Sequence, residues 1–468
     1  MPPTTSNRAP RRSASGSAAT DAGRDDAALS GPIVDTEVDD LFAALDPFAV
    51  LILAVSGGAD SVAMMHLVAR WAQRHRNPAR TILVATVDHG LREDSAREAE
   101  WVADAARSLG LAHETLQWLG DKPSTGVQEA ARAARYELLA ELGWKHGASG
   151  TVAIVTAHNE DDQAETLLMR LARGSGLDGL TGMSPSRILH ADSGCRLVRP
   201  LLAMSRARLE ATLAADKLGW LEDPSNASDK FERVRLRAAR GNLADLGLTN
   251  EKLALSARRL ERARLALEAA TLALQTDIRL DLHGGMYASL DARAFGHAEE
   301  ELRLRVATRL ISAFGGQEVV PRLSKLEALM ARLAAPDFEG ATLGGCILAR
   351  KGGTLFVYRE PERAELERLE LAPGEVGVWD RRFRVATAPE VGAPVVVRAL
   401  GPGGYATLRK KLETDPGMTQ ALPPARAAAA LPSFWQGGRL LDVPPLSALP
   451  GAPQVSSKGR HCSAEFLW

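Results

Sequence analysis

The sequence predicts an α/β protein. A doubly wound parallel sheet comes first, followed by a mainly helical middle domain and a small α+β C-terminal domain. Three observations predict this order. Short apolar runs alternate with helical periodicity up to residue 157, a long Ala-, Leu- and Arg-rich helical pattern follows, and glycine-punctuated strand pairs come last. A chain of 468 residues is long enough for two or three domains.

Four strand-like runs and the helical segments between them predict the sheet. The strands are expected at Ala49–Val55, Thr81–Val87, Ala112–Trp118 and Thr151–Ala157. The helices are expected at Ser61–Gln73, Ser95–Leu109 and Val127–Leu142. Repeated β–α units of this length give parallel strands with helices on both faces. In such a sheet, ligands bind at the carboxyl ends of the strands.

The later part of the chain gives simpler patterns. We expect helix at Asn250–Thr276 and Leu302–Leu333, a hairpin turning at Lys351–Gly353, a strand pair within residues 372–389, and a turn at Gly401–Gly404. The expected divisions are a disordered leader (1–42), a catalytic domain (43–242), a helical middle domain with a hairpin (243–392) and a small C-terminal domain (393–468).

Composition excludes several classes of protein. The formal net charge is -1, so a nucleic-acid partner would have to be held by local basic patches. Cys195, Cys346 and Cys462 lie far apart in the sequence, which argues for a reducing compartment and against a cysteine-based metal site. No apolar run is long enough to cross a bilayer, so we expect no membrane contact and a cytoplasmic location.

The stretch from Leu51 to Ser61 predicts an anion-binding turn. A branched apolar run stops at Ser56-Gly57-Gly58, and helical spacing begins at Ala59. Glycines let backbone N–H groups converge on one point, and the N-terminus of the following helix favours negative charge. Asp60 and Ser61 stand where a Walker A loop would have lysine, so the turn is not of that type.

Polar clusters also follow the second and fourth predicted strands. The second ends at Asp88-His89-Gly90-Leu91-Arg92, and the fourth is followed by His158 and an acidic helix start. Asp162 and Glu165 are three residues apart and share one helix face, forming an acidic pocket beside the turn. Two carboxylates facing a triphosphate require a cation between them. A metal ion and a substrate ammonium group both satisfy this requirement.

Basic residues gather in three places. Arg132 and Arg135 lie three apart on one predicted helix, residues 230–264 hold ten Lys or Arg against four Asp or Glu, and Arg409-Lys410-Lys411 lies near the C-terminus. Arginine pairs can bridge phosphates, and basic stripes can bind RNA. Solvated helix faces have the same composition, so both interpretations remain open at this stage.

Taken together, these motifs resemble a known family. Ser56-Gly57-Gly58-Ala59-Asp60-Ser61 resembles the PP-loop of ATP pyrophosphatases. The whole set is similar to the tRNA(Ile)-lysidine synthetase family, which joins lysine to the wobble cytidine of a minor isoleucine tRNA. The matching stretches are Ser56–Ser61, Val87–Arg92, Glu129–Tyr136, His158–Thr166 with Arg173–Leu180, Asp223–Asn226 with Arg233 and Arg237, Arg398–Tyr405 and Leu431–Trp435.

The resemblance implies ATP, Mg²⁺, L-lysine and a tRNA(Ile) with a CAU anticodon, and it is compatible with a homodimer. It implies ATP binding by Ser56, Gly57, Gly58, Ala59, Asp60, Ser61, His89 and Arg92. The implied catalytic residues are Asp60, Arg132, Arg135, His158 and Arg233, and the implied lysine-binding residues are Asp162 and Glu165. The implied tRNA-binding residues are Arg235, Arg237, Arg409, Lys410 and Lys411. Asp60 or Asp161 could hold the metal.

Two features of the sequence depart from the pattern of that family. Val234 stands where the family usually has Asn, and the turn at Gly401–Gly404 lacks an expected acidic residue.

Three other functions are alternatives. A PP-loop tRNA thiolase would also adenylate a base, but such enzymes generally rely on paired cysteines. A small-molecule PP-loop ligase needs no basic stripe. An inert RNA-binding protein would not need Asp60, Asp161, Asp162 and Glu165.

Overall fold

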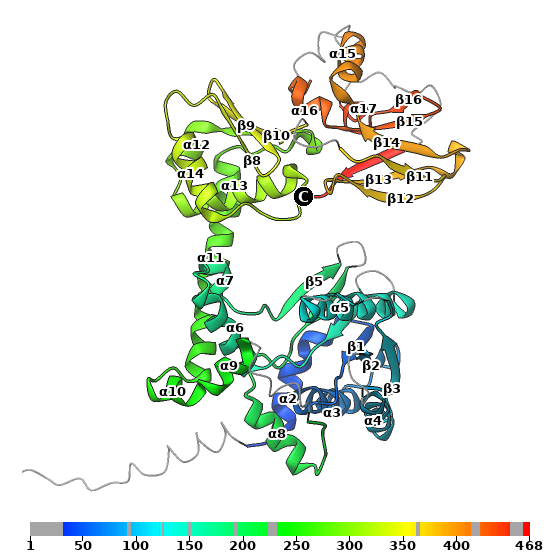
Figure 1. Ribbon diagram of the computed structural model, residues 1–468, viewed down its shortest axis with the longest axis vertical. Coiled ribbons are helices and arrows are strands. Elements are labelled where there is room, and N and C mark those ends of the chain that lie inside the picture. The colour runs from blue at the N-terminus through cyan, green and yellow to red at the C-terminus, as the bar shows by residue number, and fades with distance from the viewer. Residues whose placement is uncertain are drawn as a thin grey trace, which may run out of the picture. The chain divides into compact units, whose positions relative to one another are not determined.

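The computed structural model describes residues 31–90, 95–120, 122–123, 126–147, 151–190, 194–222, 232–361, 366–412, 422–449 and 462–468. Arg92 and the stretch Asp223–Asn226, both named above, lie outside these residues. The chain divides into two compact units, residues 1–264 and 265–468, which are described separately (Figure 1). The expected boundary at residue 392 lies within the second unit and stays a proposal.

The first unit contains a six-stranded sheet. Its strands are β1 (Val50–Ala54), β2 (Thr81–Asp88), β3 (Ala112–Gln117), β4 (Val152–Val155), β5 (Ser186–His190) and β6 (Cys195–Val198). They lie in the order β3-β2-β1-β4-β6-β5. All neighbours pair in parallel except β5, which runs antiparallel to β6. The predicted parallel sheet is confirmed, and the β5–β6 edge is a feature that the periodicity does not reveal.

Helices cover both faces of this sheet (Figure 1). On one face, Leu51 and Leu53 of β1 pack in a core with α2 (Asp35–Phe42), α3 (Ala59–Arg74), α4 (Ser95–Ser108) and α8 (Arg206–Ala215). On the other, Val50 and Ile52 pack against Leu139 of α5 (Val127–His146). Because successive strand residues point to opposite faces, a strand buried on both sides is apolar throughout. β1 is therefore a continuous apolar run.

A second group of helices lies beside the carboxyl end of β4. It comprises α6 (Glu160–Ala172), α7 (Leu177–Leu180), α9 (Glu232–Ala238), α10 (Arg240–Asp245) and α11 (Asn250–Asp277). Ala164 and Leu167 of α6 pack against Leu253 and Ala257 at the start of α11. This apolar contact and the contact of α9 with α6 bring the basic α9–α10 segment against the acidic face of α6.

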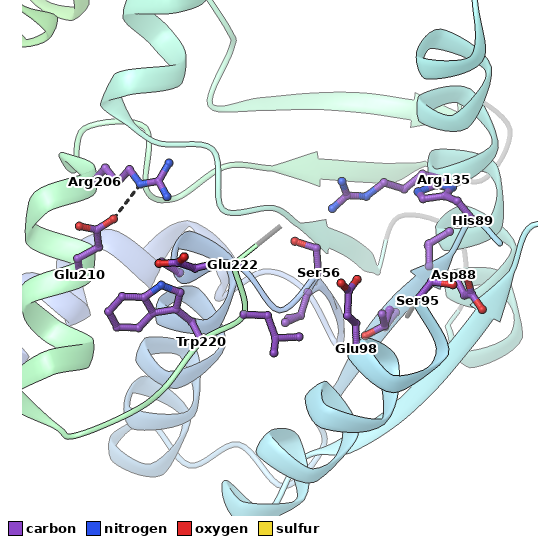
Figure 2. A pocket seen from close by; sticks show the side chains of 17 residues that line it. Ser56, Asp88, His89, Ser95, Glu98, Arg135, Arg206, Glu210, Trp220 and Glu222 are labelled. Atoms are coloured by element: carbon purple, nitrogen blue, oxygen red, sulfur yellow. Dashed lines mark hydrogen bonds and ion pairs between the residues drawn. The ribbon is translucent and has the colours of Figure 1, made fainter. Parts of the chain in front are cut away.

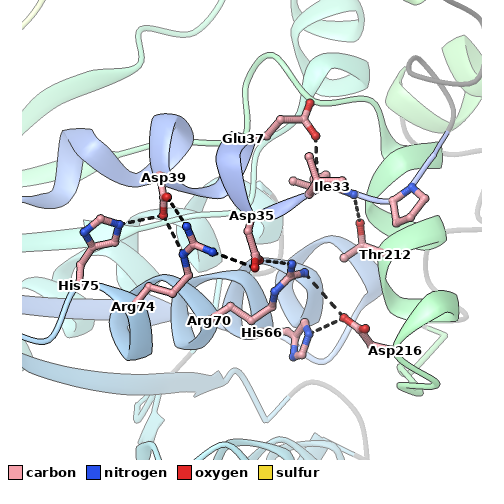
Figure 3. A network of polar contacts seen from close by, with 12 residues as sticks. Ile33, Asp35, Glu37, Asp39, His66, Arg70, Arg74, His75, Thr212 and Asp216 are labelled. Carbon is pink, nitrogen blue, oxygen red and sulfur yellow. Dashed lines mark hydrogen bonds and ion pairs between the residues drawn. The ribbon is translucent and has the colours of Figure 1, made fainter. Parts of the chain in front are cut away.

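The predicted leader reaches residue 42, but residues 31–42 belong to the folded first unit. Val38 and Phe42, four residues apart on α2, are fully buried. Asp35 forms ion pairs with Arg70 and Arg74 of α3 (Figure 3). Further contacts fix the same segment: Asp39 with Arg74 and His75, Glu37 with Arg208, and the Ile33 N–H with Thr212 Oγ1. The leader interpretation is therefore wrong for these twelve residues.

The second unit combines helices with three antiparallel sheets. The helices are α12 (Ala292–His297), α13 (Glu300–Gly315), α14 (Leu323–Leu333), α15 (Gly401–Leu412), α16 (Ala425–Ala429) and α17 (Pro444–Ser447), with short 3₁₀ turns η3 (His283–Gly285) and η4 (Pro389–Val391). The first sheet is β7 (Ala288–Asp291), β10 (Thr354–Arg359), β9 (Cys346–Lys351) and β8 (Gly340–Leu343). The second is β11 (Leu369–Leu371), β14 (Val395–Ala399), β15 (Pro432–Gln436) and β16 (Arg439–Asp442). The third is β12 (Val376–Trp379), β13 (Phe383–Thr387) and β17 (Cys462–Phe466).

These elements confirm the predicted hairpin at Lys351–Gly353 and the strand pair after residue 372. The turn expected at Gly401–Gly404 is instead the first turn of α15, because Pro402 is tolerated where a helix N–H has no partner. Among the described helices, none combines the length and apolarity needed to span a membrane.

Candidate active site

A cavity of about 670 Å³ lies at the carboxyl ends of β1 and β2 (Figure 2). The turn after β1 and the end of β2 form part of its wall. The described residues that line it are Val55, Ser56, Gly58, Ala59, Ala85, Thr86, Val87, Asp88, His89, Ser95, Glu98, Arg135, Arg206, Glu210, Trp220, Leu221 and Glu222. The structure thus brings the predicted turn, His89 and Arg135 together, at the edge of the sheet where ligands are expected.

The turn after β1 contributes Ser56, Gly58 and Ala59 to the wall of this cavity. The Ser56 N–H donates to Ser61 Oγ over 3.2 Å, and the Ser61 hydroxyl donates to the Gly58 carbonyl over 2.9 Å. Among the described residues, the N–H groups of residues 57–60 have no acceptor. Unpaired N–H groups at a helix N-terminus bind anions. Ser61 therefore holds the shape of the turn, and its unpaired N–H groups could accept an anion as their partner.

Gly57 is required by both conformation and space. Its φ of +88° lies in the left-handed region that side chains disfavour. An added Cβ would lie 2.7 Å from Leu221 Cδ1. Leu221 also donates its N–H to the Gly57 carbonyl over 2.9 Å. The segment after α8 thus contacts the turn at Gly57, holds it in place and also lines the cavity.

Asp60 has the properties expected of a magnesium ligand. Burial raises the pKa of Asp60 to about 6, and its Oδ1 atom is buried without a hydrogen-bond partner among the described residues. No group of three or more His, Cys, Asp or Glu is arranged as a metal cage in the part of the chain that the structure describes. Mg²⁺ is commonly held by one or two carboxylates together with substrate phosphates, so a single unpaired carboxylate fits it. The other candidate, Asp161, contacts Arg240 Nη1 at 2.8 Å.

His158 lies in a strongly positive environment. Burial lowers the pKa of His158 to about 2, and the charges of Arg199, Arg132, Arg135 and Arg233 act in the same direction. Its Nδ1 atom lies 2.9 Å from Thr156 Oγ1. Three of the predicted catalytic arginines therefore lie near enough to act electrostatically on the predicted catalytic histidine. Arg199, which is only 4% exposed and directly follows β6, acts with them, and no sequence signal pointed to it.

The acidic face of α6 is occupied by arginines of α9 and α10. Glu165 is 3% exposed and accepts hydrogen bonds from Arg237 Nε at 2.6 Å and Arg240 Nη2 at 3.1 Å. Asp162 forms a capping box with Asn159, and burial raises the pKa of Asp162. The predicted lysine-binding carboxylates do lie together. However, Arg237, predicted to bind tRNA, points at Glu165.

The other predicted tRNA-binding residues are on helix surfaces. Arg235 is exposed on α9, and Arg409 and Lys410 are exposed on α15. Lys411 is within α15, but its side chain lies outside the described part of the structure. These roles remain predictions.

The cavity contains residues that the motifs did not reveal. Ser95 and Glu98 come from α4, Arg206 and Glu210 from α8, and Trp220 from the segment after α8. Arg206 Nε donates to Glu210 Oε1 over 2.9 Å (Figure 2). In the sequence this is an ordinary i,i+4 pair on a helix, which gives no reason to place it beside a phosphate.

Comparison with known proteins shows which family this chain matches. A family model described as a PP-loop domain matches residues 32–242. The tRNA(Ile)-lysidine synthase of Bradyrhizobium diazoefficiens is 43% identical over 355 residues, which cover 71% of this chain and 96% of that protein. The protein of the same name from Mesorhizobium japonicum is 36% identical over 88% of each chain.

One solved structure shows a weak resemblance. The U34-tRNA thiolase NcsA from Methanococcus maripaludis, solved with its [4Fe-4S] cluster, is 16% identical, with a TM-score of 0.41 over 48% of this chain and 78% of that chain. That similarity is too low to bear on function. The near-complete coverage of a relative at 43% identity shows that this chain belongs to the tRNA(Ile)-lysidine synthase family, with a PP-loop domain as its first unit.

Proposed function

We propose that this chain uses ATP to join L-lysine to the wobble cytidine of a tRNA(Ile) with a CAU anticodon, forming lysidine and releasing AMP and pyrophosphate. The observation that carries the proposal is a glycine turn with unpaired backbone N–H groups on the wall of a cavity, near the buried carboxylates of α6, in a chain of this family. The N–H groups would bind an anion, and the carboxylates would suit a cationic amino acid.

The first step would activate the base. The ring carbonyl oxygen of cytidine attacks the α-phosphorus of ATP, and the bond from that phosphorus to the β-phosphate oxygen breaks. The N–H groups of residues 57–60 would hold the departing pyrophosphate. Arg132, Arg135 and Arg233 would stabilise the charge that develops on the α-phosphate. Asp60 would hold Mg²⁺, which neutralises phosphate charge when bound.

The second step would transfer lysine. The side-chain amine attacks the activated ring carbon, and AMP leaves with the former carbonyl oxygen. Asp162 and Glu165 would bind the amino acid. A free lysine side chain has a pKa of about 10.4, so a base must remove its proton before attack. His158 could serve only after phosphates offset the surrounding arginines, because its pKa without them is about 2. A carboxylate of the pocket is the other candidate.

RNA binding would come from basic residues of α9 and α15, chiefly Arg235, Arg409, Lys410 and Lys411. Contacts of this kind are made mostly to phosphates. Binding should therefore weaken steeply as salt concentration rises. A homodimer is compatible with the proposal but is not required by it.

A labelling experiment tests the proposal directly. The protein is incubated with ATP, labelled lysine and either tRNA(Ile) with a CAU anticodon or methionine tRNA. The proposal expects label in the isoleucine tRNA only, with one AMP and one pyrophosphate formed per lysine attached. Formation of ADP, or label in both tRNAs, would refute it.

A PP-loop tRNA thiolase is less consistent with this chain. None of the three cysteines forms a disulfide, all three are buried, and none is among the described residues that line the cavity. Burial also raises the pKa of Cys195 to about 11, which makes it a poor nucleophile at neutral pH.

A further inference from the structure

The ATP cavity contains an arginine to which neither the motifs nor the family resemblance assigned a role. Arg206 is the first residue of α8, and it lines the cavity together with Ser56, Gly58 and Ala59 of the turn. In Figure 2, the guanidinium groups of Arg206 and Arg135 extend toward each other from opposite sides of the space above Ser56. These two are the arginines among the described lining residues.

The two arginines act on different parts of the cavity. Among neighbouring charges, Arg206 has the largest effect on the pKa of Asp60, at the start of α3, and it opposes the rise that burial causes. Arg135 instead is the largest cause after burial of the lowered pKa of His89, and it also lowers the pKa of His158, after burial, Arg199 and Arg132. Arg206, from α8, therefore acts on the turn after β1, while Arg135, from α5, acts on the residues after β2 and β4.

The turn needs such a cation. In a Walker A loop, a lysine reaches the β- and γ-phosphates. Here Asp60 stands near that position, so the side chains of the turn itself supply no positive charge. Backbone N–H groups and the helix N-terminus supply only about half of a positive charge. A guanidinium beside the turn provides a full positive charge. Its paired N–H groups can also donate hydrogen bonds to phosphate oxygens.

Glu210 holds this guanidinium before nucleotide arrives. Its Oε1 accepts from Arg206 Nε over 2.9 Å, and both side chains are partly exposed to the cavity. An exposed i,i+4 ion pair is weak, so phosphate oxygens can displace the carboxylate. Glu210 would then compete with the phosphates for Arg206.

We infer that Arg206 is a further ATP-binding residue, which contacts the β- and γ-phosphates and then the pyrophosphate product, and that Glu210 is the internal competitor for the same guanidinium. The inference rests on the proposed use of ATP at this cavity. It assigns the pyrophosphate end of ATP to the α8 side of the turn.

Nucleotide binding to the purified full-length chain tests this assignment. ATP, AMP and inorganic pyrophosphate are titrated in the presence of Mg²⁺ into wild type, Arg206→Gln and Glu210→Gln. Arg206→Gln should weaken ATP and pyrophosphate binding about 10- to 100-fold and change AMP binding less than about 3-fold. Glu210→Gln should tighten ATP and pyrophosphate binding and leave AMP binding unchanged. Arg107→Gln, which breaks an exposed ion pair to Asp104 on α4, is the matched control and should leave all three affinities unchanged.

The outcomes separate this inference from the proposed function. If wild type binds neither ATP nor pyrophosphate, the proposed function itself fails. If wild type binds both and Arg206→Gln alters ATP, AMP and pyrophosphate equally, or alters none of them, the assignment of Arg206 is wrong and the proposed function stands. Arg206→Lys keeps the charge and should recover part of the lost ATP affinity. An equal loss in the lysine variant and the glutamine variant would also contradict the assignment.

Discussion

Arg237 donates a hydrogen bond from Nε to Glu165 Oε1 over 2.6 Å, although the two residues are 72 positions apart in the sequence. Arg240 contacts the same oxygen atom, and the Glu165 side chain is 3% exposed. A guanidinium thus occupies the place that the sequence predicts for the ammonium group of lysine. Because both groups carry a single positive charge, a lysine bound as proposed would share Glu165 with Arg237 or displace it.

Glu165→Gln should weaken lysine use selectively. The substitution removes the charge that would bind an ammonium group and leaves the turn after β1 untouched. We expect the KM for lysine to rise about tenfold or more, while the affinity for ATP changes less than about threefold. Steady-state kinetics with lysine as the varied substrate measures the first, and ATP titration measures the second. Glu141→Gln, at an exposed position of α5, is the control, and equal effects of both variants would remove the assignment.

Arg237→Gln should have the opposite effect on free lysine. It removes one of the three guanidinium groups within ion-pair distance of Glu165, which are those of Arg233, Arg237 and Arg240, so lysine should meet less competition. Calorimetric titration of lysine without tRNA should show tighter binding than wild type. Tighter binding requires that Glu165 keeps its position, which Arg240 at 3.1 Å would maintain. If lysine binds more weakly to this variant, Arg237 supports the pocket and does not compete for it.

The parts of the structure that sequence predicts well are those fixed by neighbouring residues. β1 and α3 follow from apolar periodicity, and the turn between them follows from Gly57, whose positive φ excludes other residues. The site residues Ser56–Ser61 and His89 are adjacent to the strand ends. Their positions therefore follow once the parallel sheet is predicted.

The parts that sequence does not predict depend on contacts between distant segments. Arg206 joins the cavity because α8 packs on α3, and Arg237 meets Glu165 because α9 packs on α6. The α2 helix is only eight residues long, and its Val38 and Phe42 become core residues only against α3 and α8. No local pattern encodes these partners, because a helix with a solvated charged face has the same pattern of charges in its sequence.

Asp60→Asn should stabilise the protein without ligands while abolishing its activity. The folded-state pKa of Asp60, about 6, lies above its ordinary value of 3.8. The protonated form therefore stabilises the fold fully below about pH 4, and this stabilisation is lost as the pH rises through 6. At pH 8 the amide should raise the free energy of unfolding by roughly 1–3 kcal/mol. Urea unfolding at pH 5 and pH 8 measures the change, with Asp245→Asn as an exposed control. A loss of stability at pH 8 would contradict this account.

His158 should stay neutral throughout the physiological range when no nucleotide is bound. Burial and four nearby arginines lower its pKa to about 2, so its ring nitrogen signals should not titrate between pH 5 and pH 8. Nitrogen NMR of the imidazole rings, with His158→Gln to identify the signal, measures this. Bound ATP adds negative charge beside the same arginines and should raise the pKa of His158. A ring that titrates near pH 6.5 without nucleotide would show that the arginines do not act on it.

Asp380→Asn should strongly destabilise the second unit. The Asp380 side chain is 6% exposed and accepts from Arg359 Nε at 3.0 Å and Arg382 Nε at 2.6 Å, which joins the turn between β12 and β13 to the end of β10. Removing its charge leaves two buried guanidinium groups without an anion, a change that costs about 3–5 kcal/mol. Glu318→Gln is the matched control. Its partner Arg381 is in the same β12–β13 turn as Asp380, but both side chains of this ion pair are exposed. Exposed ion pairs contribute at most about 1 kcal/mol to the free energy of unfolding. Urea unfolding monitored by tryptophan fluorescence compares the two variants. The buried Trp379, which directly precedes Asp380, reports on this region. Similar midpoints for both would mean that the buried arginines find other partners.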